Sequence, residues 1–245
     1  MQKIIIFIFL VLTFICSCSE TSSEKAEDLI IEASLLSISD GQQIKDPNRV
    51  IECLNNAIKL KQSDEGYYKR GGIYTYLGQY QRAIEDYNQA IRMNPTFVYA
   101  YYSRGNNYVN LGQYQKAIED YNQVIRMNPT FAEAYNYRGV LYDQFSQYEL
   151  AIEDFSQAIR FSPGDAGAYQ NRGGAYFKIS QYELAIEDYN EAIRLKPDYA
   201  NAYKNRGTVY LFQGKKELGC SDAQKACSLG NCKVLEFAKG KGDCR

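Results

Sequence analysis

The residues of this chain that could do chemistry are carboxylates, arginines and cysteines, because its 245 residues include no histidine. The commonest general base and transition-metal ligand is therefore missing. Glu-Asp pairs recur at a fixed step of 34 in the numbering, at Glu85-Asp86, Glu119-Asp120, Glu153-Asp154 and Glu187-Asp188. A catalytic pair of carboxylates would occur once, so the repetition indicates a structural role and argues against an enzyme, including one acting on cell-wall material.

An arginine recurs at the same step, each time at the same separation from a following aspartate. The predicted pairs are Arg70 with Asp86, Arg104 with Asp120, Arg138 with Asp154, Arg172 with Asp188 and Arg206 with Asp222. A charge repeated beside its opposite predicts partly buried ion pairs between helices. An arginine ladder for phosphate or carboxylate ligands is the alternative.

Four of the seven cysteines lie close to the C-terminus, from Cys220 onward, which favours disulfides in an exported chain. Zinc is the alternative, but no Cys-x2-Cys knuckle is present. Cys220 and Cys227 would lie about 10 Å apart along one helix, beyond the roughly 7 Å that a disulfide spans. A short helix folding back after Cys232 predicts the bridges Cys227–Cys232 and Cys220–Cys244. Cys53 is expected to be a buried apolar filler.

The N-terminus has the features of a targeting signal. Lys3 precedes an apolar stretch, residues 4–15, which is shorter than the about 20 residues of a membrane span but suits a secretory signal. The following Ile15-Cys16-Ser17-Cys18 resembles the lipobox of bacterial lipoproteins, although Cys16 stands where that family more often has a small residue. The resemblance implies a signal peptide over 1–17, a lipid on Cys18, a tether over 18–25 and an outer-membrane location, on the periplasmic or the surface face. A plain cleaved signal is the alternative.

The same step of 34 organises the remaining chain and predicts stacked supersecondary units. In one unit, Tyr101, Gly105 and Tyr108 share a helix face, and Ala117 and Tyr121 begin a second face. A proline ends each of four units, at Pro95, Pro129, Pro163 and Pro197. Each unit is therefore expected to be two antiparallel helices.

The pattern Tyr-x3-Gly-x2-Tyr, Leu-Gly-x-Tyr-x2-Ala, Tyr-x2-Ala/Val and Pro is similar to the tetratricopeptide repeat (TPR). It departs from that family in the repeated arginine, where leucine is more usual, and in Ser146 and Ser180, which replace a turn glycine and predict turns that are slightly strained or differently shaped. The resemblance implies an all-α fold, a right-handed α-solenoid (TPR superhelix) of about six helix pairs plus a C-terminal capping helix. The expected boundaries are a degenerate pair over 26–63, five units over 64–97, 98–131, 132–165, 166–199 and 200–231, and a disulfide-linked cap over 232–245.

In TPR proteins the first helices of the units line a concave face that binds peptides. The resemblance therefore implies a partner-binding groove. Its residues would be Tyr68, Tyr99, Tyr102, Asn106, Asn110, Glu133, Asn136, Gln144, Gln170, Lys178 and Lys204.

The charge balance of 28 basic and 29 acidic residues argues against a nucleic-acid partner. Neither a cofactor nor a metal is expected. The expected function is a non-catalytic, lipid-anchored scaffold that binds peptide segments of other envelope proteins. A surface-exposed adhesin or host-interaction lipoprotein is the alternative, a cell-wall-active enzyme is less favoured, and the oligomeric state stays open.

Overall fold

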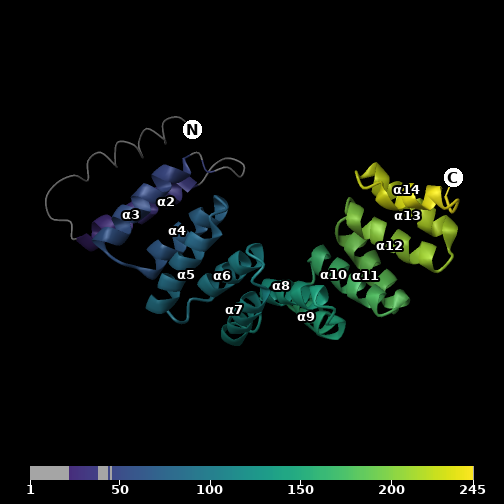
Figure 1. Ribbon diagram of the computed structural model, residues 1–245, viewed down its shortest axis with the longest axis horizontal. Coiled ribbons are helices and arrows are strands. Elements are labelled where there is room, and N and C mark those ends of the chain that lie inside the picture. Colours follow the sequence, from purple (N-terminus) through teal and green to yellow (C-terminus); the bar gives the residue numbers. More distant parts are fainter. Residues whose placement is uncertain (1–21, 38–43, 45, 245) are drawn as a thin grey trace. The chain divides into compact units, whose positions relative to one another are not determined.

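The computed structural model describes residues 22–37, 44 and 46–244 (Figure 1). The predicted signal peptide, Cys18 and the start of the tether lie outside these residues. Within the described ranges the chain forms thirteen helices and no strand, as the all-α prediction requires. They are α2 (Ser22–Ser37), α3 (Pro47–Leu60), α4 (Asp64–Tyr76), α5 (Tyr80–Met93), α6 (Val98–Asn110), α7 (Tyr114–Met127), α8 (Ala132–Gln144), α9 (Tyr148–Phe161), α10 (Ala166–Lys178), α11 (Tyr182–Leu195), α12 (Ala200–Phe212), α13 (Lys216–Ser228) and α14 (Lys233–Gly240). None of them combines the length and the apolar character that crossing a bilayer demands.

The chain divides into two compact units, and each is described by itself. Unit 1 ends at Gly112 and contains α2 to α6, and unit 2 begins at Gln113 and contains α7 to α14. Successive helices pack as antiparallel pairs, α2 with α3 and α4 with α5 in unit 1, and α8 with α9, α10 with α11 and α12 with α13 in unit 2. The described residues hold twelve helices before the final helix α14, which is the number that the predicted six pairs and a capping helix require.

Small and large residues alternate where the two helices of a pair meet. On α9, Ala151, Phe155 and Ala158 are all buried, at the i, i+4 and i+7 spacing of one helix face. Gly139 of α8 lies opposite, and a Cβ there would stand 2.8 Å from the Phe155 ring. The repeated glycine is therefore required by the close approach of the second helix.

The short turns that follow α4, α6, α8, α10 and α12 each contain a residue with positive φ. Glycine fills this position at Gly78, Gly112 and Gly214, whereas Ser146 and Ser180 fill it with φ of 59° and 62°. The two serine turns therefore keep the left-handed conformation of the glycine turns, and of the two predicted alternatives strain applies, because this region is energetically unfavourable for residues other than glycine.

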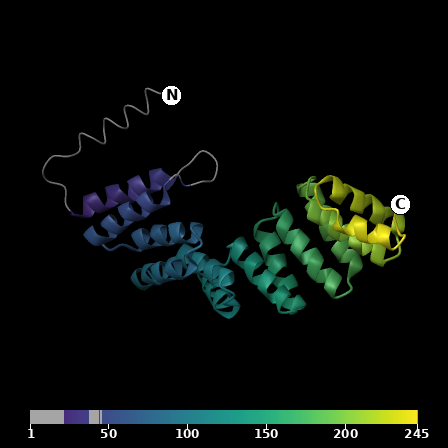
Figure 2. The same cartoon turned by 45° about the horizontal axis from the view of Figure 1, so that its top comes forward.

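The N-terminal pair is regular although its sequence departs from the repeat. Helix α2 begins at Ser22, so residues 22–25 of the predicted tether are helical. Its Ile30 packs with Val50 and Leu54 of α3 and with Ile73 of α4 in one apolar cluster. This pair, purple to blue in Figure 2, therefore joins the stack through the same kind of core as the later pairs.

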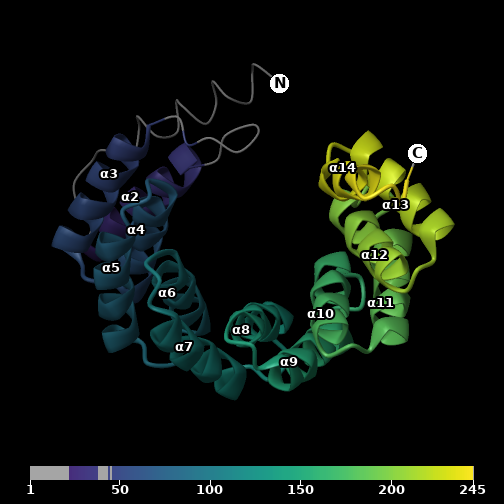
Figure 3. The same ribbon diagram turned by 45° about the vertical axis from the view of Figure 1, so that its right-hand side comes forward.

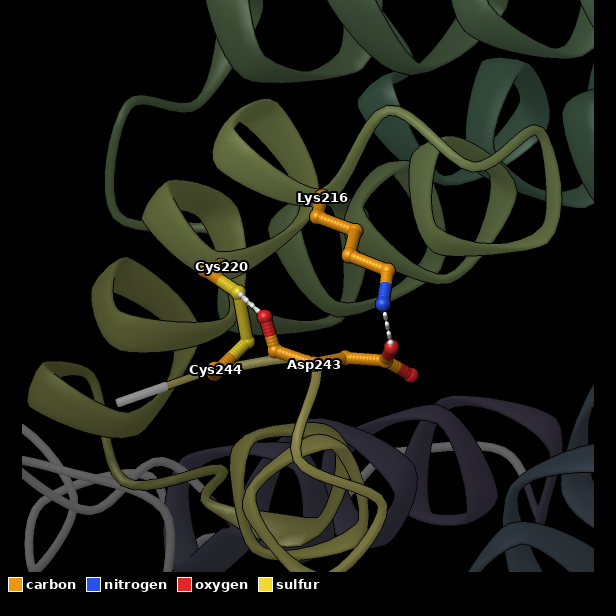
Figure 4. Close-up of a disulfide and its surroundings, with 4 residues drawn as sticks. All are labelled: Lys216, Cys220, Asp243 and Cys244. Atoms are coloured by element: carbon orange, nitrogen blue, oxygen red, sulfur yellow. Dashed lines mark hydrogen bonds and ion pairs between the residues drawn. A yellow bond between two sulfur atoms is a disulfide. The ribbon is translucent and has the colours of Figure 1, made fainter.

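The C-terminal helix α14 folds back on α13 between two disulfides. These are Cys220–Cys244 and Cys227–Cys232, the same two pairs that the spacing favours. Beside the first, Lys216 Nζ lies 2.5 Å from Asp243 Oδ1 (Figure 4). Cys53 is buried and is the one free cysteine of the described residues.

The close helix approach predicts opposite effects for two adjacent glycines of α10. Gly174→Ala should stabilise the protein by up to about 1 kcal/mol, because alanine favours the helix and the new Cβ would meet only Tyr189 Oη at 3.9 Å. Gly173→Ala should destabilise it by about 1–3 kcal/mol, because its Cβ would stand 2.9 Å from the Tyr189 ring and 3.2 Å from the Ala185 carbonyl oxygen. Urea titration followed by circular dichroism measures both. Equal effects of the two substitutions would contradict the close-packing account.

Candidate functional site

The repeated arginine joins two neighbouring helix pairs. Arg138 of α8 donates from Nε and Nη2 to the two carboxylate oxygens of Asp154 on α9, at 2.7 and 2.6 Å. Its Nη1 donates to Asn122 Oδ1 on α7, the second helix of the preceding pair, at 2.5 Å. The rings of Tyr135 and Tyr142 each lie 5.7 Å from the guanidinium carbon. One side chain thus fixes its own pair and ties that pair to the one before. We call this arrangement the arginine node.

The same arrangement recurs along the chain. Arg70, Arg172 and Arg206 each donate twice to their predicted aspartate, and Nη1 donates to Asn55, Ser156 and Asn190 in turn. Arg104 donates to Asn88, but Asp120, its predicted partner, belongs to the other unit, so that pair is not described. The predicted ion pairs are confirmed where both members lie in one unit. All three guanidinium nitrogens of each of these arginines already donate hydrogen bonds within the protein, which favours a structural role over a ladder that binds ligands.

The asparagine acceptors of this node were missed by the sequence analysis. Asn88, Asn122 and Asn190 keep the step of 34, with Ser156 in the same register. That periodicity was a usable signal. The hydrogen bond to the Asp188 carboxylate raises the pKa of the half-buried Arg172 guanidinium above its ordinary value.

The predicted groove residues of unit 1 differ in how far they are available. Tyr68 of α4 packs its ring 4.8 Å from Phe97 and 5.8 Å from Tyr87, so it contributes to packing. On α6, Tyr99 is 57 % exposed and Asn110 is also exposed. Tyr102 and Asn106 of the same helix are half-buried.

Unit 2 brings two of the predicted residues into one polar chain. Asn171 of α10 donates from Nδ2 to Asn136 Oδ1 on α8 at 3.1 Å, and its own Oδ1 accepts from Gln170 Nε2 at 3.2 Å. Tyr199, which precedes α12, donates from its hydroxyl to Gln170 Oε1 at 2.8 Å. Asn171 and Tyr199 were not predicted. These hydrogen bonds connect three successive helix pairs and hold the amides of Asn136 and Gln170 in fixed orientations.

The other predicted residues of unit 2 lie on the same three first helices, α8, α10 and α12. Lys178 of α10 forms an ion pair with Asp143 of α8 at 2.6 Å and lies 5.3 Å from the centre of the Tyr148 ring. Glu133 and Gln144 of α8 are exposed, and Lys204 of α12 is half-buried. Helix α10 contacts both α8 and α12, so the first helices form one layer of unit 2; α11 and α13 lie on the opposite side from α10 and α12 (Figure 3).

A buried polar cluster distinguishes unit 1. Asn107 of α6 is fully buried and donates to Thr75 Oγ1 at 2.9 Å and to the Ser103 carbonyl oxygen at 2.8 Å. The hydroxyl of Tyr87 lies 3.2 Å from the same Thr75 oxygen, and burial raises the pKa of Tyr87 to about 12. The equivalent position is apolar in the other four repeats, at Ile73, Leu141, Ala175 and Val209. The polar cluster around Asn107 therefore fixes how α4 and α6 pack.

A cleft of 680 Å³ lies in unit 1 beside the N-terminal half of α2, the α3–α4 connection and the end of α5. Its polar groups are engaged with one another, since Lys61 pairs with Glu27 at 3.3 Å and Asn94 donates to Asp64 at 2.8 Å. None of the predicted groove residues lines it.

Stacked antiparallel helix pairs, a regular sequence period and a layer of first helices define a helical-repeat protein. A family model described as TPR repeat matches residues 71–112 and 173–214, and one described as tetratricopeptide repeat matches residues 102–166. The chain belongs to the tetratricopeptide repeat family. Proteins of this family are generally non-catalytic scaffolds, and this chain is a TPR protein-protein interaction scaffold.

Solved structures agree with this assignment. A structure of MamA is 26% identical with a TM-score of 0.62, covering 70% of this chain and 96% of MamA. YrrB, described as a TPR protein with an unusual peptide-binding site, is 20% identical with a TM-score of 0.66, covering 78% of this chain and 99% of YrrB. The pilF protein of Pseudomonas aeruginosa is 13% identical with a TM-score of 0.75, covering 89% of this chain and 99% of pilF. The last two show the fold alone. No curated protein matches the sequence of this chain.

The arginine node predicts a large difference between single and double substitutions. Arg172→Leu should lower the free energy of unfolding by about 3–5 kcal/mol, because it leaves the Asp188 carboxylate buried without a cation. Arg172→Leu/Asp188→Leu should lose far less, since no buried charge remains. Urea titration measures both, with Arg194→Leu as the control. Its exposed pair with Glu191 should contribute less than about 1 kcal/mol. A double variant no more stable than Arg172→Leu would contradict the assignment.

Proposed function

We propose that this protein is a lipid-anchored scaffold of the bacterial cell envelope whose layer of first helices binds peptide segments of other envelope proteins. One observation carries the peptide-binding part. Asn136, Gln170 and Lys204 occupy the same register position on α8, α10 and α12, and they differ while the arginine node behind them repeats. A recognition surface needs side chains that differ from repeat to repeat on helices whose packing stays the same.

The chemistry of this surface suits an extended peptide. Amide side chains donate and accept hydrogen bonds, as the groups of a peptide backbone do. The bonds to Asn171 and Tyr199 hold Asn136 and Gln170 in place before a ligand arrives, which lowers the entropy lost on binding. The likeness to YrrB, described as having a peptide-binding site, supports the same use of this fold.

The envelope location is supported by the two ends of the chain. Lys3, the apolar residues 4–15 and the sequence Ser17-Cys18 fit a lipoprotein signal. At the other end, four cysteines form two disulfides, which persist in an oxidising compartment outside the cytoplasm.

The peptide-binding proposal predicts that Asn136→Ala/Gln170→Ala loses partners. Crosslinking and pull-down from cell membranes should recover at least about tenfold less partner protein with this variant, because both removed amides belong to one preorganised surface. Gln224→Ala, an exposed amide on α13, is the matched control and should retain every partner. Full recovery with the double variant, folded by circular dichroism, would show that this face is not the binding site.

The anchoring proposal predicts that Cys18→Ala moves the protein from the membrane fraction to the soluble fraction. Several acyl chains on one cysteine anchor a protein stably, so their loss should release it. Fractionation and intact-mass analysis measure the change, and globomycin should block maturation of the natural protein. An unchanged mass and membrane fraction after substitution would refute lipidation at Cys18.

A further inference from the structure

The second helices change character between the beginning and the end of the stack. In α5 and α7 the second and third residues are polar or basic, Gln81-Arg82 and Gln115-Lys116. In α9, α11 and α13 the same two positions are Glu149-Leu150, Glu183-Leu184 and Glu217-Leu218. Two residues per helix change together in three consecutive pairs, all within unit 2. We call the six residues the Glu-Leu stripe.

The leucines of the Glu-Leu stripe are exposed, and packing within the helix pairs does not require them. Leu150, Leu184 and Leu218 are 45%, 40% and 52% exposed. The residue that follows each of them is buried within its helix pair, so packing is already satisfied by that neighbour. Scattered exposed leucines are ordinary, but these three share one register position on the second helices of three consecutive pairs.

On α9 and α11 the charged residues closest in sequence to the leucines are acidic, whereas on α13 Lys215 and Lys216 also precede Glu217, and Lys216 is paired with Asp243. A glutamate precedes each leucine, and Glu153 and Glu187 follow one turn later on α9 and α11. Glu183 accepts a hydrogen bond from Gln213 at 3.1 Å, but none of these five carboxylates forms an ion pair within the described part of the chain. Apolar groups flanked by unneutralised acids are complementary to apolar groups flanked by bases.

The Glu-Leu stripe is separate from the proposed peptide-binding face. It lies on α9, α11 and α13, whereas Asn136, Gln170 and Lys204 lie on α8, α10 and α12. Figure 3 shows α11 and α13 on the side of unit 2 opposite to α10 and α12. A ligand on one layer therefore leaves the other layer accessible.

We propose that the Glu-Leu stripe docks a basic polypeptide segment, one that presents apolar side chains between lysines or arginines. The leucines would bury apolar surface against that segment and the glutamates would select for its positive charge. An anionic membrane surface would be repelled by the same glutamates. A second copy that presented the same stripe would bring like charges together.

The chain provides the variant that tests the proposal. Changing all three Glu-Leu pairs to Gln-Lys reproduces the natural Gln115-Lys116 pair of α7, so each helix keeps a beginning that this fold already uses. The probe is a fluorescein-labelled synthetic peptide of leucine and lysine with leucines on one helical face, and its binding is followed by fluorescence anisotropy. The natural protein should bind it at least about tenfold more tightly than the triple-pair variant, and added salt should weaken binding.

Two further variants test the Glu-Leu stripe separately from the proposed peptide-binding face. Gln115→Glu/Lys116→Leu extends the Glu-Leu stripe to α7 and should tighten binding. Asn136→Ala/Gln170→Ala should bind the probe as the natural protein does, so failure of the peptide-binding proposal would leave this one untouched. Single-pair exchanges, each checked by thermal melting, give the same test if the triple-pair variant does not fold.

Several results would overturn the proposal. One is equal binding of the probe by the natural protein and a folded Gln-Lys variant. Another is equal binding of a control peptide in which glutamate replaces every lysine. Co-sedimentation of the natural protein with vesicles of phosphatidylcholine and phosphatidylglycerol, lost in the Gln-Lys variant, would assign the Glu-Leu stripe to a membrane instead. No saturable binding of the probe below about 1 mM would likewise contradict it.

Discussion

The arginine node is the interaction on which the rest of the structure depends. Arg138 binds Asp154 in its own helix pair and Asn122 in the preceding pair, between two tyrosine rings. An arginine at an interface between helices is tolerated because its charge is paired with a carboxylate and its remaining guanidinium nitrogen also donates a hydrogen bond. The node therefore fixes the spacing of the pairs, and it removes the repeated charges from the set of residues open to a ligand.

The sequence predicted the fold because the step of 34 carries both faces of every helix pair. The glycines opposite Phe155 and Tyr189, the strained turns at Ser146 and Ser180 and the ion pairs followed from residues that repeat. Asn107 was not predicted as a buried residue, because its burial depends on Thr75 and Tyr87 as neighbours and not on its own register. Features that occur once give no periodic signal.

The candidate site was predicted less completely than the fold. Register placed Asn136 and Gln170 on the first helices, but their bonds through Asn171 and Tyr199 depend on side-chain directions that a sequence pattern does not contain. Tyr68 was placed correctly on α4 and yet packs against Phe97. A position on the right helix indicates where a side chain starts, and its neighbours decide whether it is available.

The division between constant and variable positions explains how one stack of helix pairs can present two separate binding surfaces. The node and the small residues inside each pair use the positions where adjacent helices meet, so the outward positions of both layers are free to change without loss of the stack. On the first helices those positions hold amides and a lysine, and on α9, α11 and α13 they hold the Glu-Leu stripe. The two layers share the node but no outward side chain. Substitutions on one layer should therefore leave recognition by the other unchanged, because distant sites without common partners act independently.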